Sequence, residues 1–193
     1  MTGGPSSENE LIRRARDGDE EAFAGLVMLH ADRVQGALRR FGLDANEADE
    51  VSQEVFLRAW RGLPRFEGRA QFSTWLYRIA FNESQRRLSR RPPPRAEADP
   101  DRDDPVVSLP ESPNLSPEAQ TLGHEFEQKL ERALEQLPTD WRAAVVLRDI
   151  EGLSTHEAAE IVGVGEAAFK SRLHRGRMQL RALLEPYLRL EEG

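Results

Sequence analysis

The chain has 193 residues, of which 38% are apolar and 32% are charged, with no cysteine and a formal net charge of −7. The lack of cysteine excludes disulfides, thiolate zinc sites and cysteine nucleophiles. No stretch approaches the roughly 20 apolar residues that a membrane span requires, and the polar start of the chain lacks the order of a signal peptide. We therefore expect no membrane insertion. The lack of cysteine fits a cytoplasmic protein, and a disulfide-free secreted protein would give the same composition.

Charge is distributed unevenly along the chain. Residues 56–91 carry nine basic and two acidic side chains, whereas residues 92–123 carry two basic and seven acidic ones. Such alternation can place cationic faces against phosphate while acidic faces meet another protein. Ordinary solvated helix surfaces would give the same pattern, so charge alone does not choose between the two interpretations.

Capping residues predict where the first three helices begin. Ser7 and Glu10 have the spacing of a capping box before an apolar helical pattern. Asp19 is placed to cap a second helix. Asp44 and Glu47 form another capping pair before a third helix.

Helix-breaking residues predict where these helices end, namely Gly18, Gly42, Gly62 and Pro64. The third helix is therefore expected to run to about residue 61. A fourth helix is expected from a residue near Ser73 to a residue near Arg91, after a loop over residues 64–70.

Residues 92–123 are predicted to form an extended acidic, proline-rich linker. Eight prolines lie between residues 92 and 117, a density that sustains neither a helix nor a central strand. The linker separates an N-terminal domain over residues 1–91 from a C-terminal domain over residues 124–193. No alternating strand pattern occurs in either part, so the sequence predicts an all-α fold of two small helical domains.

Four helices are expected in the C-terminal domain. The first has apolar residues at helical spacing and ends near Leu137. Pro138 suits the first turn of the second helix, which ends at Gly152. The third is short, and the last is expected to run from Glu166 towards Leu184, because Pro186 discourages continuation.

Residues 154–177 have the form of a helix-turn-helix. Ala159 is small where two helices would cross, Gly163 supplies a permissive backbone for the turn, and Phe169 would fill the core between the helices. The second helix would expose donors for base edges and cations for phosphate. These candidate DNA-binding residues are Glu166, Lys170, Ser171, Arg172, His174, Arg175 and Arg177. An ordinary helical hairpin with a basic face is the alternative.

This C-terminal pattern resembles region 4 of the bacterial sigma-70 family, the domain that reads the −35 promoter element. The matching motifs are Leu137–Pro138, Glu151–Ser154, Ala159–Ile161 and Lys170–Arg175. The resemblance implies that the basic run lies in or beside the major groove. Glu166, Ala167 and Ala168 depart from the small polar residues that commonly start this helix, which leaves the sequence preference open.

Residues 47–60 resemble region 2.2 of the same family. Asp49 and Gln53 are one helical turn apart, as are Glu50 and Glu54. The resemblance implies that this face binds the clamp helices of the largest polymerase subunit, through Asp49, Glu50, Gln53, Glu54, Phe56 and Trp60. A capped amphipathic helix whose acids only solvate it explains this segment equally well.

Residues 65–87 resemble regions 2.3 and 2.4, which recognise the −10 element and assist strand opening. Aromatic side chains interleaved with arginines can stack an unpaired base and hold its phosphate. The candidate residues are Arg65, Phe66, Arg69, Phe72, Arg78, Asn82 and Arg86. Phe66 and Trp75 could instead be core residues, and for Trp75 the core interpretation is favoured.

The resemblance spans residues 8–91 and 124–188 and implies an alternative sigma factor of the extracytoplasmic-function group (group 4). It implies three partners: core RNA polymerase, bound through the clamp helices and the flap of the second-largest subunit, promoter DNA, and an anti-sigma factor. No nucleotide-binding loop, metal-ligand cluster or nucleophile–base set is evident, so we expect no enzyme activity, cofactor or metal. A DNA-binding regulator that does not recruit polymerase, or an antagonist that mimics a sigma factor, are the alternatives.

Overall fold

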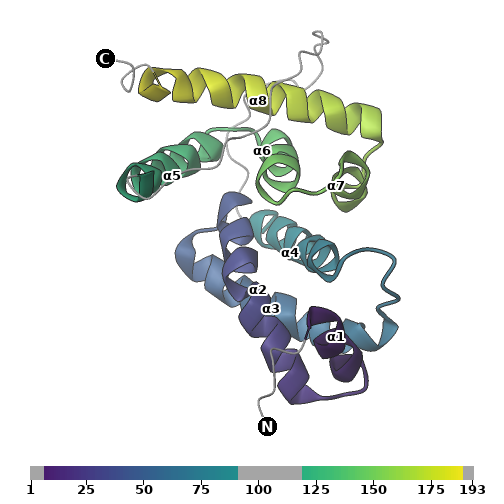
Figure 1. The fold of residues 1–193 in the computed structure, drawn as a ribbon. Helices are drawn as coiled ribbons and strands as arrows, with labels where there is room; N and C mark the ends of the chain where they lie inside the picture. The colour runs from purple at the N-terminus through teal and green to yellow at the C-terminus, as the bar shows by residue number, and fades with distance from the viewer. Residues whose placement is uncertain (1–6, 91–118, 189–193) are drawn as a thin grey trace. The chain divides into compact units, whose positions relative to one another are not determined.

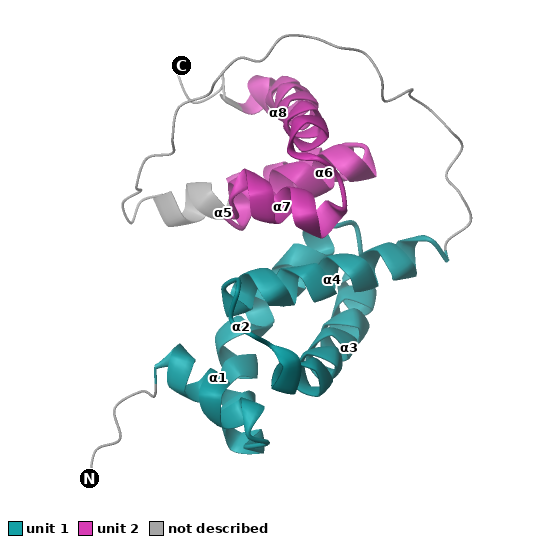
Figure 2. Ribbon diagram, turned by 90° about the vertical axis from the view of Figure 1, so that its right-hand side faces the viewer, with its two compact units in different colours: residues 1–92 teal, residues 93–193 magenta. Residues whose placement is uncertain are grey.

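The computed structural model describes residues 7–90 and 119–188, and all regular structure in these two ranges is helical (Figure 1). The all-α class predicted from the sequence is confirmed. The chain divides into two compact units, Met1–Pro92 and Pro93–Gly193 (Figure 2). Most of the predicted linker, residues 92–118, lies outside the described residues.

Unit 1 is a bundle of four helices with a short 3-10 turn. The helices are α1 (Glu8–Arg16), α2 (Glu20–Arg40), α3 (Ala45–Gly62) and α4 (Phe72–Leu88), and the turn η1 (Leu63–Arg65) follows α3. Helices α2, α3 and α4 pack against one another, and α1 packs against α2. The fourth helix therefore begins one residue before Ser73 and ends three residues before Arg91.

The core of unit 1 is aliphatic and aromatic, and it follows the helical spacing of the sequence. Leu26, Val34 and Leu38 recur along α2 and are fully buried, as is Val55 on α3. Residues three, four or eight positions apart share one face of a helix, so a single stripe of each helix supplies the core. Leu76 on α4 completes it.

Two of the three predicted caps in unit 1 are confirmed. The Asp19 carboxylate accepts a hydrogen bond from the Ala22 backbone amide at 3.0 Å. Asp44 and Glu47 form a full capping box, with bonds of 2.9 and 3.2 Å. Ser7 is the N-cap residue of α1 as predicted, but the predicted capping box is wrong, because its side chain makes no capping bond.

Unit 2 contains four α-helices and one π-helical segment. The elements are α5 (Ala119–Glu135), α6 (Thr139–Val145), the π-helical η2 (Val146–Ile150), α7 (Thr155–Val162) and α8 (Glu166–Leu188). Helices α5, α6 and α7 all pack against α8. The second predicted helix is therefore split, since its C-terminal half widens into the π-helix.

Three boundaries in unit 2 differ from the sequence prediction. Helix α5 begins at Ala119, so the last five residues of the predicted linker are helical; the prolines that prevent a helix stop at Pro117. Pro138 is the N-cap of α6 and not part of its first turn. Helix α8 continues through Pro186, where the missing amide affects only the last turn of the helix.

The predicted helix-turn-helix is present as α7 and α8. The Ser154 hydroxyl accepts a bond from the Glu157 amide, and the Glu157 carboxylate accepts one from the Ser154 amide, at 3.2 and 3.0 Å. Gly163 ends α7 in the left-handed conformation, with φ 73°, which a residue with a side chain rarely adopts. Phe169 is fully buried at the start of α8.

Candidate polymerase and nucleic-acid interfaces

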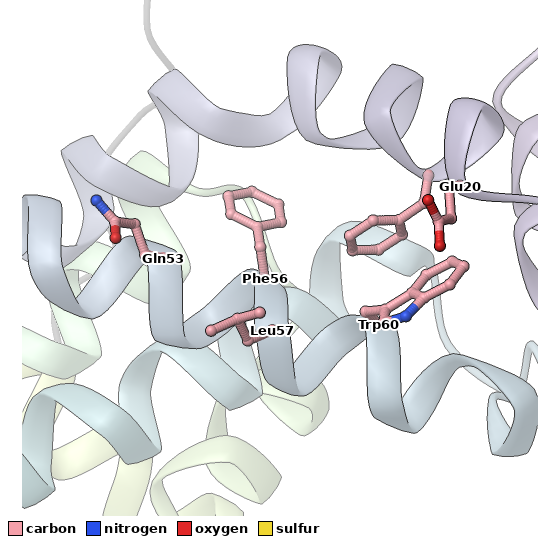
Figure 3. A pocket seen from close by; sticks show the side chains of 6 residues that line it. Glu20, Gln53, Phe56, Leu57 and Trp60 are labelled. Atoms are coloured by element: carbon pink, nitrogen blue, oxygen red, sulfur yellow. The ribbon is translucent and has the colours of Figure 1, made fainter.

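An apolar cavity of about 420 Å³ opens on unit 1 between α2 and α3. It is lined by Glu20, Phe23, Gln53, Phe56, Leu57 and Trp60. Figure 3 shows Gln53, Phe56, Leu57 and Trp60 projecting from α3, with Glu20 beside Trp60. Positions 53, 56, 57 and 60 share one face of a helix because they lie three or four residues apart.

The cavity combines a fixed wall with an exposed rim. Phe56 is 8% exposed, and the rings of Phe23 and Trp60 stack at 4.9 Å between centroids and 52° between planes. Leu57 is 50% exposed, so it offers apolar surface without a partner in unit 1. An accessible apolar rim over a rigid aromatic wall is the kind of surface that receives a side chain from another protein.

Three of the six residues predicted to bind polymerase line this cavity: Gln53, Phe56 and Trp60. Leu57 was not among the predicted residues, although its spacing from Gln53 and Trp60 could have identified it. Glu20 and Phe23 were also missed. They come from a different helix, and nothing in the local pattern shows that α2 passes beside α3.

The three predicted acids on α3 have partners within unit 1. Asp49 accepts a hydrogen bond from the Gln35 amide. Glu50 lies 2.9 Å from Arg87, and Glu54 lies 2.9 Å from Arg58. Asp49 and Glu50 are exposed and Glu54 is half-buried, so all three remain near the surface that carries the cavity.

Two of the −10 candidates, Phe66 and Phe72, are buried in unit 1. They are 9% and 3% exposed and form an aromatic cluster with Trp75 and His30, with ring centroids 5.0 to 5.8 Å apart. Aromatic packing of this kind stabilises the loop before α4 and leaves no ring face open to a base. The favoured core interpretation of Trp75 agrees with its place in this cluster.

The polar candidates for the −10 element lie at the surface of unit 1. Exposed side chains are found at Arg65, Arg69, Arg78, Asn82 and Arg86. Arg69 pairs with Glu67 at 2.6 Å, and Arg86 pairs with Glu83 at 3.1 Å. The structure thus places these four arginines along η1, the loop after it and α4, and the ion-pair partners of Arg69 and Arg86 are local acids.

The candidate −35 residues lie along α8, but several contact other parts of unit 2. Glu166 and Lys170 are exposed, whereas the other five are half-buried: Ser171, Arg172, His174, Arg175 and Arg177. Glu166 lies 3.2 Å from His156 on α7, and Arg172 lies 3.3 Å from Asp140 on α6. Arg177 bonds to Asp149 through both guanidinium nitrogens that face it.

Two arginines have raised pKa values because of these pairs. The hydrogen bond to Asp149 is the main cause of the raised pKa of Arg177, which burial opposes. The hydrogen bond to Glu47 is the main cause of the raised pKa of Arg87. Both guanidinium groups therefore stay charged, and both are held by carboxylates in the isolated protein.

Within residues 7–90 and 119–188 there is no cluster of three or more His, Cys, Asp or Glu side chains suited to a metal ion. No helix in those ranges combines the length and apolar character needed to cross a membrane.

The family models of Sigma-70 region 2 and Sigma-70, region 4 match residues 26–92 and 127–180. The chain is 36% identical to RNA polymerase sigma-H factor of Pseudomonas aeruginosa over 190 residues, covering 94% of this chain and 96% of the relative. It is 34% identical to ECF RNA polymerase sigma-E factor of Escherichia coli over 186 residues, covering 95% and 97%. The solved structure of CnrH in complex with the cytosolic domain of CnrY is similar, with a TM-score of 0.62, 28% identity and coverage of 91% and 96%. The chain therefore belongs to the sigma-70 family, in its extracytoplasmic-function group.

Proposed function

We propose that this sigma factor docks on core RNA polymerase through the α2–α3 cavity and its rim. The observation that carries the proposal is the half-exposed Leu57 beside the buried Phe56 and the half-buried rings of Phe23 and Trp60, with the acids Glu50 and Glu54 on the same helix. An apolar centre with a charged rim is typical of a specific protein interface. The clamp helices of the largest subunit are the partner that the family resemblance implies for this face.

The promoter is read by the basic faces of the two units. Exposed polar residues of the η1–α4 loop and α4 are proposed to hold the −10 element: Arg65, Arg69, Arg78, Asn82 and Arg86. Residues of α8 are proposed to contact the −35 element in the major groove, foremost the exposed Lys170. Residues 92–118 connect the two regions, and unit 2 provides the contact with the flap of the second-largest subunit.

The chain acts by binding and positioning, without covalent chemistry of its own. Its place of action is the cytoplasm, because core polymerase and promoter DNA are there. CnrH was solved with the cytosolic domain of a second protein bound. We propose that a comparable partner, an anti-sigma factor, holds this chain inactive by covering the polymerase-docking cavity.

Run-off transcription with purified core polymerase on a pool of genomic promoters tests the function as a whole. Addition of the protein is expected to give discrete transcripts that share upstream motifs. Leu57→Asp tests the docking surface, since a carboxylate in an apolar contact carries a desolvation cost. We expect it to weaken core binding about tenfold or more, as at an interface hot spot.

Leu29→Asp is the matched control for Leu57→Asp. Leu29 is 56% exposed on α2, the same residue type with similar exposure, but it does not line the cavity. If the two variants weaken core binding equally, the cavity is not the docking site. If the wild-type protein neither binds core polymerase nor yields transcripts, the sigma function fails and a DNA-binding regulator takes its place.

A further inference from the structure

Four charged side chains form a continuous chain of ion pairs between α3 and α4, here called the α3–α4 ion-pair chain: Glu54, Arg58, Glu83 and Arg86. Glu54 lies 2.9 Å from Arg58, Arg58 lies 3.0 Å from Glu83, and Arg86 lies 3.1 Å from Glu83. One end, Glu54, is on the proposed polymerase face. The other end, Arg86, is on the proposed −10 face.

The atoms within this chain are shared. Arg58 Nε, which carries a single hydrogen, lies 2.9 Å from Glu54 Oε1 and 3.0 Å from Glu83 Oε1. The same oxygen of Glu83 accepts from Arg86 Nη1 at 3.1 Å. One hydrogen cannot serve two carboxylates fully, and one oxygen shares its charge between two guanidinium groups. A change at Glu54 therefore alters how strongly the Glu83 carboxylate interacts with Arg58 and with Arg86.

Glu83 is the buried member of the chain. Its side chain is 10% exposed, compared with 41% for Arg58 and 59% for Arg86. Because its side chain is buried, water screens the charge of Glu83 less than it screens the charges of Glu54, Arg58 and Arg86. A carboxylate at that depth depends on its cationic partners, so it holds Arg86 close to α4 while no other anion competes.

We propose that Glu83 is a positioning residue that couples polymerase docking to −10 DNA binding. When a docked polymerase engages Glu54, the Arg58 Nε–H belongs to Glu83 alone. The ion pair between Glu83 and Arg86 then weakens, and the Arg86 guanidinium becomes available to a DNA phosphate. The free protein, in contrast, keeps Arg86 neutralised. This inference rests on the proposed function of the two faces.

Linkage makes the proposal quantitative. If docking raises DNA affinity by some factor, bound DNA raises core affinity by the same factor, and couplings of this kind commonly amount to about 5- to 150-fold. The ion-pair chain contributes that portion of this coupling factor which is lost when Glu83 loses its charge. A purely structural role of Glu83 in packing α3 against α4 would change stability and leave this factor unaltered.

Glu83→Gln is the first test, because it keeps the size of the side chain and removes the charge. The probe is single-stranded DNA carrying the non-template −10 segment of a promoter found by run-off transcription. Its affinity is measured for the free full-length protein and for holoenzyme, with core polymerase alone as the blank. The free variant is expected to bind the strand about three- to tenfold more tightly than wild type. The gain on adding core is expected to shrink by the same factor.

Arg58→Gln is the second test, with a different expected result. It disconnects Glu54 from Glu83 but leaves Glu83 paired with Arg86. The affinity of the free variant for DNA is therefore not expected to rise, while the gain on adding core is expected to shrink as in Glu83→Gln. A gain in DNA affinity of the free protein in Glu83→Gln but not in Arg58→Gln, with a loss of coupling in both, is a pattern that mere destabilisation does not give.

Glu10→Gln is the matched control. Glu10 pairs with Arg13 at 2.6 Å on α1, so this change also removes one carboxylate from an arginine pair but leaves α3 and α4 intact. It is expected to behave as wild type in both assays. If core polymerase raises the DNA affinity of Glu83→Gln by as much as that of wild type, the proposal is overturned. If Glu83→Gln does not fold, the same result for Arg58→Gln overturns it. Failure of the wild-type protein to bind core polymerase would instead refute the proposed function.

Discussion

Arg177 on α8 and Asp149 on η2 form a two-point ion pair, with Nε 2.9 Å from Oδ2 and Nη2 2.5 Å from Oδ1. The two residues are 28 positions apart in sequence, and the pair joins α8 to the π-helical segment before α7. Parallel bonds from one guanidinium to one carboxylate fix orientation as well as distance. Arg177 therefore positions α8 in the free protein, whatever it contacts on DNA.

Asp149→Asn is expected to destabilise unit 2, because it removes the charge that both Arg177 nitrogens face. The side chains are 32% and 31% exposed, so the loss should be modest, about 1 kcal/mol of unfolding free energy, and smaller at high salt. Urea unfolding followed by circular dichroism measures it. Asp140→Asn, which breaks the longer 3.3 Å contact with Arg172, should cost less. Equal costs would argue against a special role of the two-point pair.

Gly176→Ala is expected to destabilise unit 2, although alanine favours helices. A Cβ on Gly176 would lie 2.8 Å from Val145 Cγ2 and 3.0 Å from the Trp141 backbone oxygen, which is fixed within α6. Overpacking costs about 1–3 kcal/mol, which outweighs the gain in helix propensity of about 1 kcal/mol. Thermal unfolding of the full chain measures the difference.

Gly36→Ala is the matched control for that change. Its Cβ would meet only the Arg40 side-chain terminus, at 3.1 Å from Nη1, and a flexible guanidinium can move away. The control variant should therefore be as stable as wild type or more stable. If Gly176→Ala also gains stability, α6 and α8 are not as closely packed as the distances indicate.

Ser154→Ala is expected to weaken the start of α7 by about 1 kcal/mol, because the Glu157 amide loses its acceptor. Ser154→Asp supplies another good cap and should retain stability. The two variants are compared by urea unfolding. A loss of stability in both would show that the hydroxyl contributes in another way, for example through its 2.7 Å bond to Glu157.

Local features of this fold could be predicted from sequence, and features that depend on tertiary contacts could not. Asp19 and Asp44 were identified as caps because a cap involves residues only three positions apart. The burial of Phe66 and Phe72 could not be decided, since the same aromatic residues before a basic helix fit both a core and a base-stacking surface. Their contacts with Trp75 decide it.

The same distinction holds for the candidate sites. One face of α3 could be predicted from the spacing of Gln53, Phe56 and Trp60. Phe23 could not, because it reaches the cavity from α2, 37 positions before Trp60 in the chain, through ring packing that no local pattern encodes. The basic run of α8 was visible in the sequence, but the acids that hold Arg172 and Arg177 lie on α6 and η2.

Asp19→Asn is expected to lower stability at neutral pH but not in acid. The pKa of Asp19 is lowered, first by the hydrogen bond from the Ala22 backbone amide and then by that from Arg14. A carboxyl with a depressed folded-state pKa stabilises the fold above its ordinary pKa, and this contribution is lost as pH falls through the folded-state value. Asparagine keeps the cap and lacks the charge.

Urea unfolding at neutral pH and in acid separates the two effects of Asp19→Asn. Wild type should be the more stable protein at neutral pH, and the two curves should converge once Asp19 is protonated. A constant difference across the pH range would mean that the cap geometry, and not the charge, distinguishes the variant.

Lys170→Ala tests the assignment of α8 to promoter DNA, and the chain provides its own control. The sequence has two lysines, Lys170 on the exposed face of α8 and Lys129 on α5, whose ammonium lies 5.0 Å from the centre of the Tyr187 ring. A lysine that contacts phosphate adds affinity for all sequences, so its loss should weaken holoenzyme binding to −35 DNA uniformly and reduce the salt slope by about one. Lys129→Ala removes the same charge from unit 2 and should leave both quantities unchanged. If the two variants lower the salt slope equally, the effect belongs to net charge, and Lys170 has no specific contact with the DNA backbone.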